Sequence, residues 1–448
     1  MKRRTFLIIL ILAALSLLLY AGVQAQSPGY AGSEKCAQCH GAKYESYAHT
    51  WHAQVLRLAT DENVLGDFSA ADTDLTFGRD DIAYVVGGQF SQRYLTEIDG
   101  ELYVLPAQWN VTTQEWVSYH PDDWQERPYA RLCAGCHTTG FNATTGAWIE
   151  NGVQCEACHG PGLNHVSLAG DTSFIVNPAL LTFDDQTAIC GQCHLRGHDP
   201  SGEHDFPIEY QPGGPVALDE AFIPVTDDGA FWPDGSSRQH HQEYLDWKLS
   251  GHAESVPCAF CHVSHSQGET IHQTRFVGNH RCVICHEEKK DLALHIPYHP
   301  VGELLCTDCH MPVLAQAATV EYNFDIHSHT FWPPDPAVTV RYGGQEAMPN
   351  ACTLCHADKS PQWAAEAMGL ELTESSLAPT PIPVTPPTPI PAATPFPVDE
   401  GSYEEKAGVN RNLTRWSMGG LGIIIAVMAV ILVVGPREKN GDDERRSA

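Results

Sequence analysis

The cysteines of this 448-residue chain fall into one repeated pattern. All 16 occur in pairs with two residues between the members, and a histidine directly follows the second cysteine of every pair. No cysteine is left over for another kind of site. The units are Cys36/Cys39/His40, Cys133/Cys136/His137, Cys155/Cys158/His159, Cys190/Cys193/His194, Cys258/Cys261/His262, Cys282/Cys285/His286, Cys306/Cys309/His310 and Cys352/Cys355/His356.

Paired cysteines also serve as disulfides in exported chains, as zinc half-sites and as thiol redox centres. None of these uses requires a histidine directly after the second cysteine. Histidine makes up 24 of the 448 residues, about 5%, so its presence after every pair is far from chance. The pattern predicts eight covalently bound c-type haems, because Cys-x-x-Cys-His is the attachment signal for this cofactor. The two thiols would bind one haem, and the adjacent histidine would be the proximal iron ligand.

Sixteen histidines remain for the opposite, distal side of the irons. Methionine is the main alternative ligand, but between the two chain ends it occurs only as Met311, Met348 and Met368. Most irons should therefore have two histidine ligands, which favours low-spin iron, low reduction potentials and electron transfer. The distal candidates are His52, His165, His252, His265, His299, His329, His198 and His120.

Some of these candidates have an alternative close by in the chain. The alternatives are His49 for His52, His295 for His299 and His327 for His329, and one of His240 and His241 is a further candidate. The histidines mostly left without an iron are His204, His272 and His280.

The proportion of cofactor to chain predicts the fold class. Roughly 350 residues for eight haems leave the haems to form much of the core, so we expect a mainly α fold with long loops wrapped around a haem stack. One long gap between units is different, because residues 82–117 alternate β-branched and aromatic residues around Asp99-Gly100. This segment predicts a small β-hairpin or meander insertion.

Both chain ends predict export and anchoring. Residues 1–25 combine Lys2, Arg3 and Arg4 with an apolar run and a small-residue cleavage site, as a signal peptide does. Residues 416–435 carry no charge and are about 20 residues long, enough to cross a bilayer as a helix. We therefore expect a single C-terminal membrane anchor.

The export signal predicts the orientation and the domain order. The haem domain, residues 26–377, is expected on the extracytoplasmic side of the cell membrane, with residues 436–448 as a cytoplasmic tail. Residues 378–399 are rich in proline and threonine, a composition that favours an extended stalk.

Beyond the haem units, several longer stretches carry a family resemblance. The chain resembles multihaem cytochromes c related to the tetrahaem electron acceptors of hydroxylamine oxidoreductase, a superfamily that also includes pentahaem nitrite reductases and octahaem oxidoreductases. The stretches are SEKCAQCH with HTWHA, YVVGGQFSQRYL with LYVLPAQWN, CAGCHTTGFNATTGAWIENGVQCEACHGPGLNH, SGHAESVPCAFCHVSHS, HPVGELLCTDCHMP, HSHTF and PNACTLCHADKSPQW, over most of residues 32–368.

The resemblance implies haems in stacked pairs close enough for fast electron transfer. It also implies that His165, His252, His299 and His329 are distal ligands. One departure is that the nitrite reductases bind their active-site haem through Cys-x-x-Cys-Lys, whereas every unit here ends in histidine.

Two functions follow as expectations. The first is an electron carrier that connects a membrane or soluble donor, such as a quinol-oxidising complex or a soluble cytochrome, with an acceptor. The second is an octahaem oxidoreductase acting on nitrite, hydroxylamine, tetrathionate or sulfite at one haem with an open axial site. Nucleic acid is excluded as a partner, because a net charge of −29 would repel phosphates. The oligomeric state is left open.

Overall fold

Short helices carry the cysteine units. The computed structural model describes residues 29–69, 75–226, 229–268, 270–299, 304–317 and 325–372. Each cysteine pair lies on or at the end of a short helix, where residues three apart share one face. The α-helices are α2 (Ser33–Tyr47), α3 (Tyr129–Leu132), α4 (Ala134–His137), α5 (Cys155–His159), α6 (Leu163–Ser167), α7 (Phe183–Gly191), α8 (Leu218–Ala221), α9 (Glu243–Leu249), α10 (Cys258–Cys261), α11 (His280–Val283), α12 (Leu292–His295), α13 (Cys306–His310), α14 (Pro336–Arg341), α15 (Ala351–Cys355) and α16 (Pro361–Ala367).

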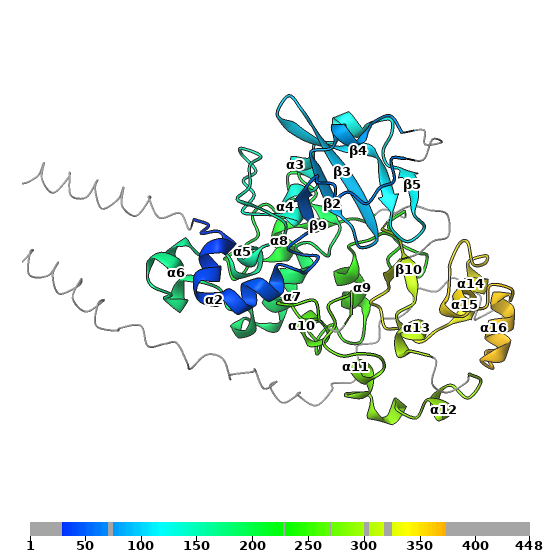
Figure 1. Ribbon diagram of the computed structural model, residues 1–448. Helices are drawn as coiled ribbons and strands as arrows, with labels where there is room; N and C mark the ends of the chain where they lie inside the picture. The colour runs from blue at the N-terminus through cyan, green and yellow to red at the C-terminus, as the bar shows by residue number, and fades with distance from the viewer. Residues whose placement is uncertain are drawn as a thin grey trace, which may run out of the picture. The chain divides into compact units, whose positions relative to one another are not determined.

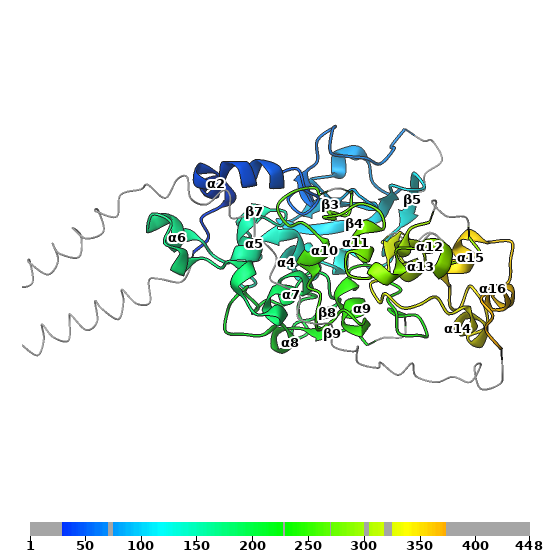
Figure 2. The same ribbon diagram turned by 90° about the horizontal axis from the view of Figure 1, so that it is seen from below.

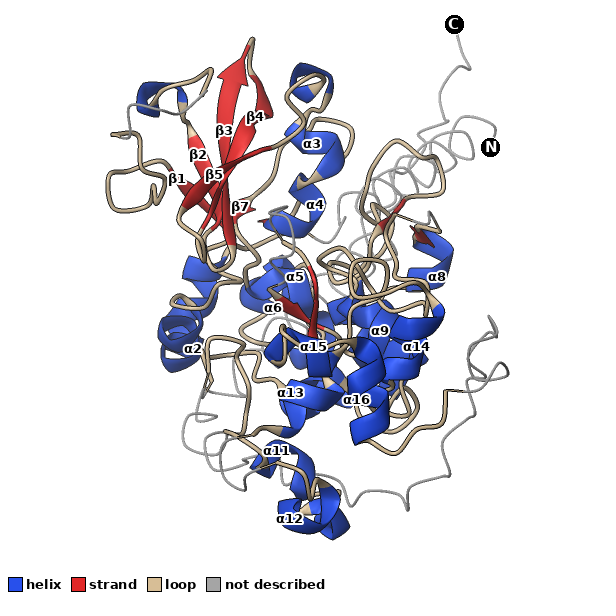
Figure 3. Ribbon diagram, turned by 90° about the vertical axis from the view of Figure 1, so that its right-hand side faces the viewer, coloured by secondary structure: helices blue, strands red, loops and turns tan. Residues whose placement is uncertain are grey.

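Strands form one larger sheet and three small pairs. The larger sheet is an antiparallel meander of five strands in sequence order, grouped at one end of the described region (Figures 1 and 3). Its strands are β1 (Leu56–Leu58), β2 (Tyr84–Gly87), β3 (Ser91–Ile98), β4 (Glu101–Asn110) and β5 (Glu115–Ser118). The pairs are β6 (Thr138–Thr139) with β7 (Glu150–Asn151), β8 (Gly197–His198) with β9 (Ile223–Pro224), and β10 (Val313–Ala315) with β11 (Ile326–His327).

The sheet corrects the predicted fold class in two respects. The described residues form a mixed helix and sheet fold rather than a mainly α one. The meander expected over residues 82–117 is present as β2 to β5, and β1 extends it to five strands by pairing with β2. The Asp99–Gly100 turn joins β3 to β4, as its sequence predicts, with φ of 52° and 86°.

The two faces of the sheet bury different clusters. One cluster includes Leu95 and Val104 of the sheet together with Tyr129 and Ala134 of α3 and α4. The sheet therefore packs directly against the helices of the second cysteine unit. The other face buries Tyr94 and neighbouring apolar residues beneath the segment that connects β1 to β2.

A close backbone approach joins the first, second and third units. Gly152 has a φ of 77°, and a Cβ atom there would lie 2.2 Å from the carbonyl oxygen of Ala53. Its N–H donates to the carbonyl of His137 at 3.1 Å, while Val153 donates to the carbonyl of His52 at 2.9 Å. Since only glycine tolerates both the conformation and the contact, this residue keeps the loop of His52 beside the end of α4.

A buried carboxylate holds the first unit against the third. Glu156 of α5 accepts hydrogen bonds from the backbone N–H groups of Ala31 at 2.8 Å, Gly32 at 2.8 Å and Gly162 at 2.6 Å. Bonds of this kind to an ionised oxygen are stronger than neutral ones. They fix the start of α2 beside α5, as Figure 2 shows from below.

The predicted signal peptide, stalk, anchor and tail lie outside the described residues. Within the described part of the chain, the helices are too short or too polar to span a bilayer.

Candidate functional site

Seven of the predicted proximal histidines face a second imidazole. Two imidazoles bound to one metal ion through bonds of about 2 Å would have ring centroids roughly 6 Å apart. The observed pairs are His40 with His165 at 6.5 Å, His159 with His265 at 5.9 Å, His194 with His52 at 6.1 Å, His262 with His329 at 6.3 Å, His286 with His252 at 6.0 Å, His310 with His295 at 6.1 Å and His356 with His299 at 6.2 Å. Each pair therefore has room for one iron between its rings.

Most of the facing histidines come from distant parts of the chain. His265 lies only three residues after His262, yet it faces His159. His52 follows the first unit and faces His194 of the fourth. In both cases, the histidine that faces a proximal ring lies next to a different cysteine unit in the sequence.

Hydrogen bonds orient many of these rings. Backbone carbonyls can only accept, so a ring Nδ1 beside one must donate its proton and leave Nε2 free for a metal. Among the proximal histidines, His159 donates to Val176 at 2.8 Å and His262 donates to His272 at 2.9 Å. On the facing side, His165 donates to Asp171 at 2.9 Å. The coordinating nitrogen is therefore chosen before any metal binds.

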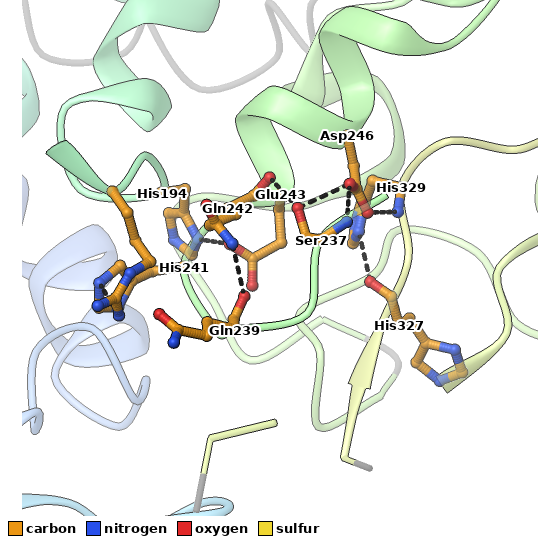
Figure 4. Close-up of polar contacts among 10 residues, drawn as sticks. His194, Ser237, Gln239, His241, Gln242, Glu243, Asp246, His327 and His329 are labelled. Carbon is orange, nitrogen blue, oxygen red and sulfur yellow. Dashed lines mark hydrogen bonds and ion pairs between the residues drawn. The ribbon is translucent and has the colours of Figure 1, made fainter. Parts of the chain in front are cut away.

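Asp246 positions the ring that faces His262. Its carboxylate is 1% exposed and accepts from the backbone N–H of His329 at 3.0 Å. It also accepts from the Ser328 hydroxyl at 2.9 Å. The Ser237 backbone N–H donates to it at 2.8 Å and the Ser237 hydroxyl at 2.7 Å (Figure 4). Asp246 belongs to α9, so this helix anchors the strand-like segment that carries His329.

A second residue of α9 acts on the fourth unit. The Glu243 carboxylate lies 3.0 Å from Nδ1 of His194 (Figure 4). Burial is the largest single effect and lowers the pKa of His194, but the charge and hydrogen bond of Glu243, together with nearby cysteines, raise that pKa to about 9. On the facing ring, Nδ1 of His52 contacts the neutral side chain of Gln273 at 2.9 Å. His194 is therefore the more electron-rich ligand of this pair.

Glu243→Gln is expected to raise the reduction potential of the iron at His194. The carboxylate makes its imidazole partner more basic and so stabilises the oxidised metal; its loss should raise the potential by on the order of 60 mV, which corresponds to a tenfold change for one electron. A potentiometric titration of the holoprotein measures this shift. Glu288→Gln is the matched control, because that exposed carboxylate lies 4.0 Å from His286, and it should produce little change. Equal shifts in both variants would contradict the prediction.

Cysteine thiols of different units lie side by side. Direct thiol contacts join Cys36 to Cys155, Cys136 to Cys193, Cys190 to Cys258, and Cys282 to Cys306. At longer range, Cys158 lies near Cys193, Cys261 near Cys285, and Cys309 near Cys352. Numbered in chain order, the units therefore run in the series one, three, four, five, six, seven and eight, with the second unit attached to the fourth.

The structure separates the sequence candidates into two groups. The candidates that face a proximal histidine are His52, His165, His252, His265, His299 and His329. His120 and His198 do not: His120 contacts Asp123 at 3.4 Å, and His198 contacts the carbonyl of Asp199 at 2.8 Å.

His295 was treated as an alternative to His299, but both rings face a proximal histidine. The two lie four residues apart and serve His310 and His356, respectively. At His327/His329 and at His49/His52, by contrast, only one histidine of each neighbouring pair faces a proximal ring.

Two thiols on a helical turn, a histidine beside them and an imidazole across from it suit a covalently bound haem with two axial histidines. The residues present therefore fit this cofactor, and their repetition along the chain defines a multihaem c-type cytochrome. Haem iron with two histidine ligands transfers electrons, so electron transfer is the general activity of this protein.

Comparison with known proteins supports this class. The family model described as cytochrome c554 and c-prime matches residues 109–160, which include the second and third units. The crystal structure of the outer cell wall cytochrome OcwA has a similar fold, with a TM-score of 0.62, 23% identity, and coverage of 76% of this chain and 86% of that one.

Two further structures align less well. The undecahaem S-layer cytochrome of Carboxydothermus ferrireducens has a TM-score of 0.41 and 20% identity, covering 78% of this chain and 59% of that one. The octahaem sulfite reductase MccA of Wolinella succinogenes has a TM-score of 0.37 and 16% identity, covering 68% of this chain and 58% of that one. With its repeated Cys-x-x-Cys-His units, the chain is similar to multihaem c-type cytochromes, and it shares the fold of OcwA.

Proposed function

We propose that this protein is a membrane-anchored octahaem cytochrome that carries electrons outside the cytoplasm. Each Cys-x-x-Cys-His unit binds one haem, and each of the seven facing histidine pairs holds one iron. The observation that carries the proposal is the series of facing rings, all spaced for a single metal ion.

The contacts between cysteine units support a continuous path for electron transfer from haem to haem. Thiols of successive units in the series approach one another, so haems attached to them would also be neighbours. Electrons would enter from a quinol-oxidising complex or a soluble cytochrome and leave to another redox protein or an external acceptor. The acidic surface favours partners with a basic or neutral docking face.

The chain ends support the location. The sequence of residues 1–25 suits export, and that of residues 416–435 suits a single membrane anchor beyond a proline-rich stalk. One protein of similar fold is an outer cell wall cytochrome, which agrees with a position outside the cytoplasm.

The mass of the intact protein tests the haem count. We expect the mature chain plus eight haems, with the signal peptide removed. Deletion of residues 416–435 should move the holoprotein from the membrane fraction to the soluble extracytoplasmic fraction without haem loss. Fewer than eight haems would refute the octahaem assignment, and a truncated protein that stays in the membrane would refute the anchor.

A second candidate function, the oxidation or reduction of a small nitrogen or sulfur compound, is favoured by one observation. The proximal histidine of the second unit, His137, faces no second imidazole among the described residues.

A further inference from the structure

Two histidines that face none of the proximal rings face each other instead. The rings of His272 and His327 have centroids 5.6 Å apart and meet at 85°. Two imidazoles bound to one metal ion through bonds of about 2 Å have centroids roughly 5 to 6 Å apart, depending on the angle between the bonds. The spacing of this pair therefore suits a single ion held between the two rings.

Both rings have a nitrogen available to a metal. Nδ1 of His327 donates to the carbonyl of Met311 at 2.5 Å, which leaves Nε2 as the unprotonated nitrogen. The ring of His272 packs against Phe90 and His327 and makes no hydrogen bond within the described part of the chain. Both side chains are partly exposed, so an ion can reach them from the solvent.

The surrounding structure holds both rings in place before a metal binds. His272 stacks on Phe90 at 19°, with centroids 6.0 Å apart. The side chain of Gln89 donates to the carbonyl of the preceding residue, Ile271, at 3.2 Å. His327 belongs to β11, which pairs with β10. Ligands that are already positioned lose little conformational freedom on binding, which favours affinity.

The same two residues also support both ligands of one iron. The backbone carbonyl of His272 accepts from Nδ1 of His262 at 2.9 Å. The backbone carbonyl of His327 accepts from Nδ1 of His329 at 2.9 Å (Figure 4). His262 and His329 are the facing pair of the fifth unit. An ion bound between His272 and His327 would therefore lie beside this iron.

A second pair of contacting histidines does not suit a cation. The rings of His240 and His241 have centroids 4.2 Å apart. Nε2 of His240 lies 3.3 Å from Arg93, and Nε2 of His241 lies 3.4 Å from Arg196. These guanidinium groups use the acceptor nitrogens and repel a second positive charge.

The donor atoms determine which ion the site would take. Neutral imidazole suits Cu²⁺, Ni²⁺ and Zn²⁺, and Cu²⁺ forms the most stable complexes of the three. Mg²⁺ and Ca²⁺ require oxygen ligands. Arg281 lies near His272, and its positive charge further disfavours an ion that binds imidazole weakly. We therefore expect Cu²⁺ to bind best, with water in the remaining positions.

We propose that His272 and His327 bind one divalent transition-metal ion beside the iron of the fifth unit, and that Cu²⁺ binds most tightly. The two side chains form this site by themselves, and it goes beyond the proposed electron transfer. Only its position beside an iron rests on the proposed haem at Cys258 and Cys261.

Titration of the full-length ferric holoprotein with a simple Cu²⁺ salt tests the site. The ferric form is used because its haems cannot reduce the ion. We expect one tightly bound ion per molecule, and electron paramagnetic resonance should show a copper signal split by two imidazole nitrogens. The absence of tight binding, or a copper signal without nitrogen splitting, would overturn the proposal.

Single substitutions test the two ligands. His272→Gln and His327→Gln should each weaken Cu²⁺ binding roughly hundredfold or more, because one imidazole lacks the advantage of two linked donors. The backbone carbonyls that hold His262 and His329 remain in both variants, so haem content should not change. His280→Gln is the matched control, because it removes an exposed histidine further along the same segment, and it should bind Cu²⁺ as tightly as the unaltered protein. Unchanged binding in either variant of the pair, or equal weakening in the control, would refute the site.

Intact mass separates this inference from the proposed function. Eight haems without tight Cu²⁺ binding would refute the metal site and leave the electron carrier intact. Fewer than eight haems, with a copper site that both variants of the pair abolish, would refute the octahaem assignment and support the metal site.

Discussion

Asp246→Ala is expected to release the imidazole of His329 and to convert the iron at His262 from low spin to high spin. The variant loses an acceptor that holds Ser237, Ser328 and the backbone of His329 at 2.7–3.0 Å. Two of those donors are backbone N–H groups that would stay buried and unpaired. The free energy of unfolding should fall by about 3–5 kcal/mol.

The spin state of the haem irons and the stability of the fold together test whether Asp246 holds His329 in place. Electron paramagnetic resonance of the ferric protein should show one additional high-spin haem, and denaturant unfolding should give the loss in stability. Asp246→Asn is the matched control, because the amide oxygen can still accept from one backbone donor while the charge is gone. It should destabilise the fold less than alanine does. An unchanged low-spin count in the alanine variant would show that His329 does not depend on Asp246.

Replacing Cys258 and Cys261 together with serine is expected to remove one haem from the middle of the series. The fifth unit contacts the fourth through Cys190 and lies near the sixth at Cys285. A haem contributes several hundred Å² of apolar contact, so its loss should cost on the order of 5–10 kcal/mol at about 25 cal/mol per Å². The flanking haems would also lose their connection.

Removal of the haem from the first unit, at the end of the series, is the control for removal of the central haem. Cys36→Ser with Cys39→Ser removes a haem at the end of the series, where Cys155 is the one thiol of another unit in contact among the described residues. Intact mass should show seven haems in each variant, and thermal unfolding should show the larger loss for the central one. Equal effects would contradict the proposed order of the units.

The attachment chemistry could be predicted from the sequence because it is local. Cys258, Cys261 and His262 need only one helical turn to present two thiols and an imidazole to the same cofactor. No contact with a distant part of the chain is needed to bring these three side chains together. For the same reason, the Asp99–Gly100 turn could be predicted from its two residues.

The size of the sheet could not be predicted in this way. β1 contains only three residues, Leu56–Leu58, and pairs with β2 across a gap of more than 20 residues. The position of β1 in the sheet depends on the apolar cluster that contains Leu56 and Tyr129. It does not depend on an alternation of residue types within β1 itself. The interpretation as a small hairpin missed it because a short strand carries little periodicity.

The sequence by itself predicted which cysteines would bind haem and that histidine would supply most distal ligands. Only the tertiary structure decided which histidine faces which unit. His265 faces His159 rather than an iron near His262, and His295 and His299 serve two different units. The physical reason is distance along the chain: a distal ligand must cross the haem from another segment, so its identity depends on how remote segments pack.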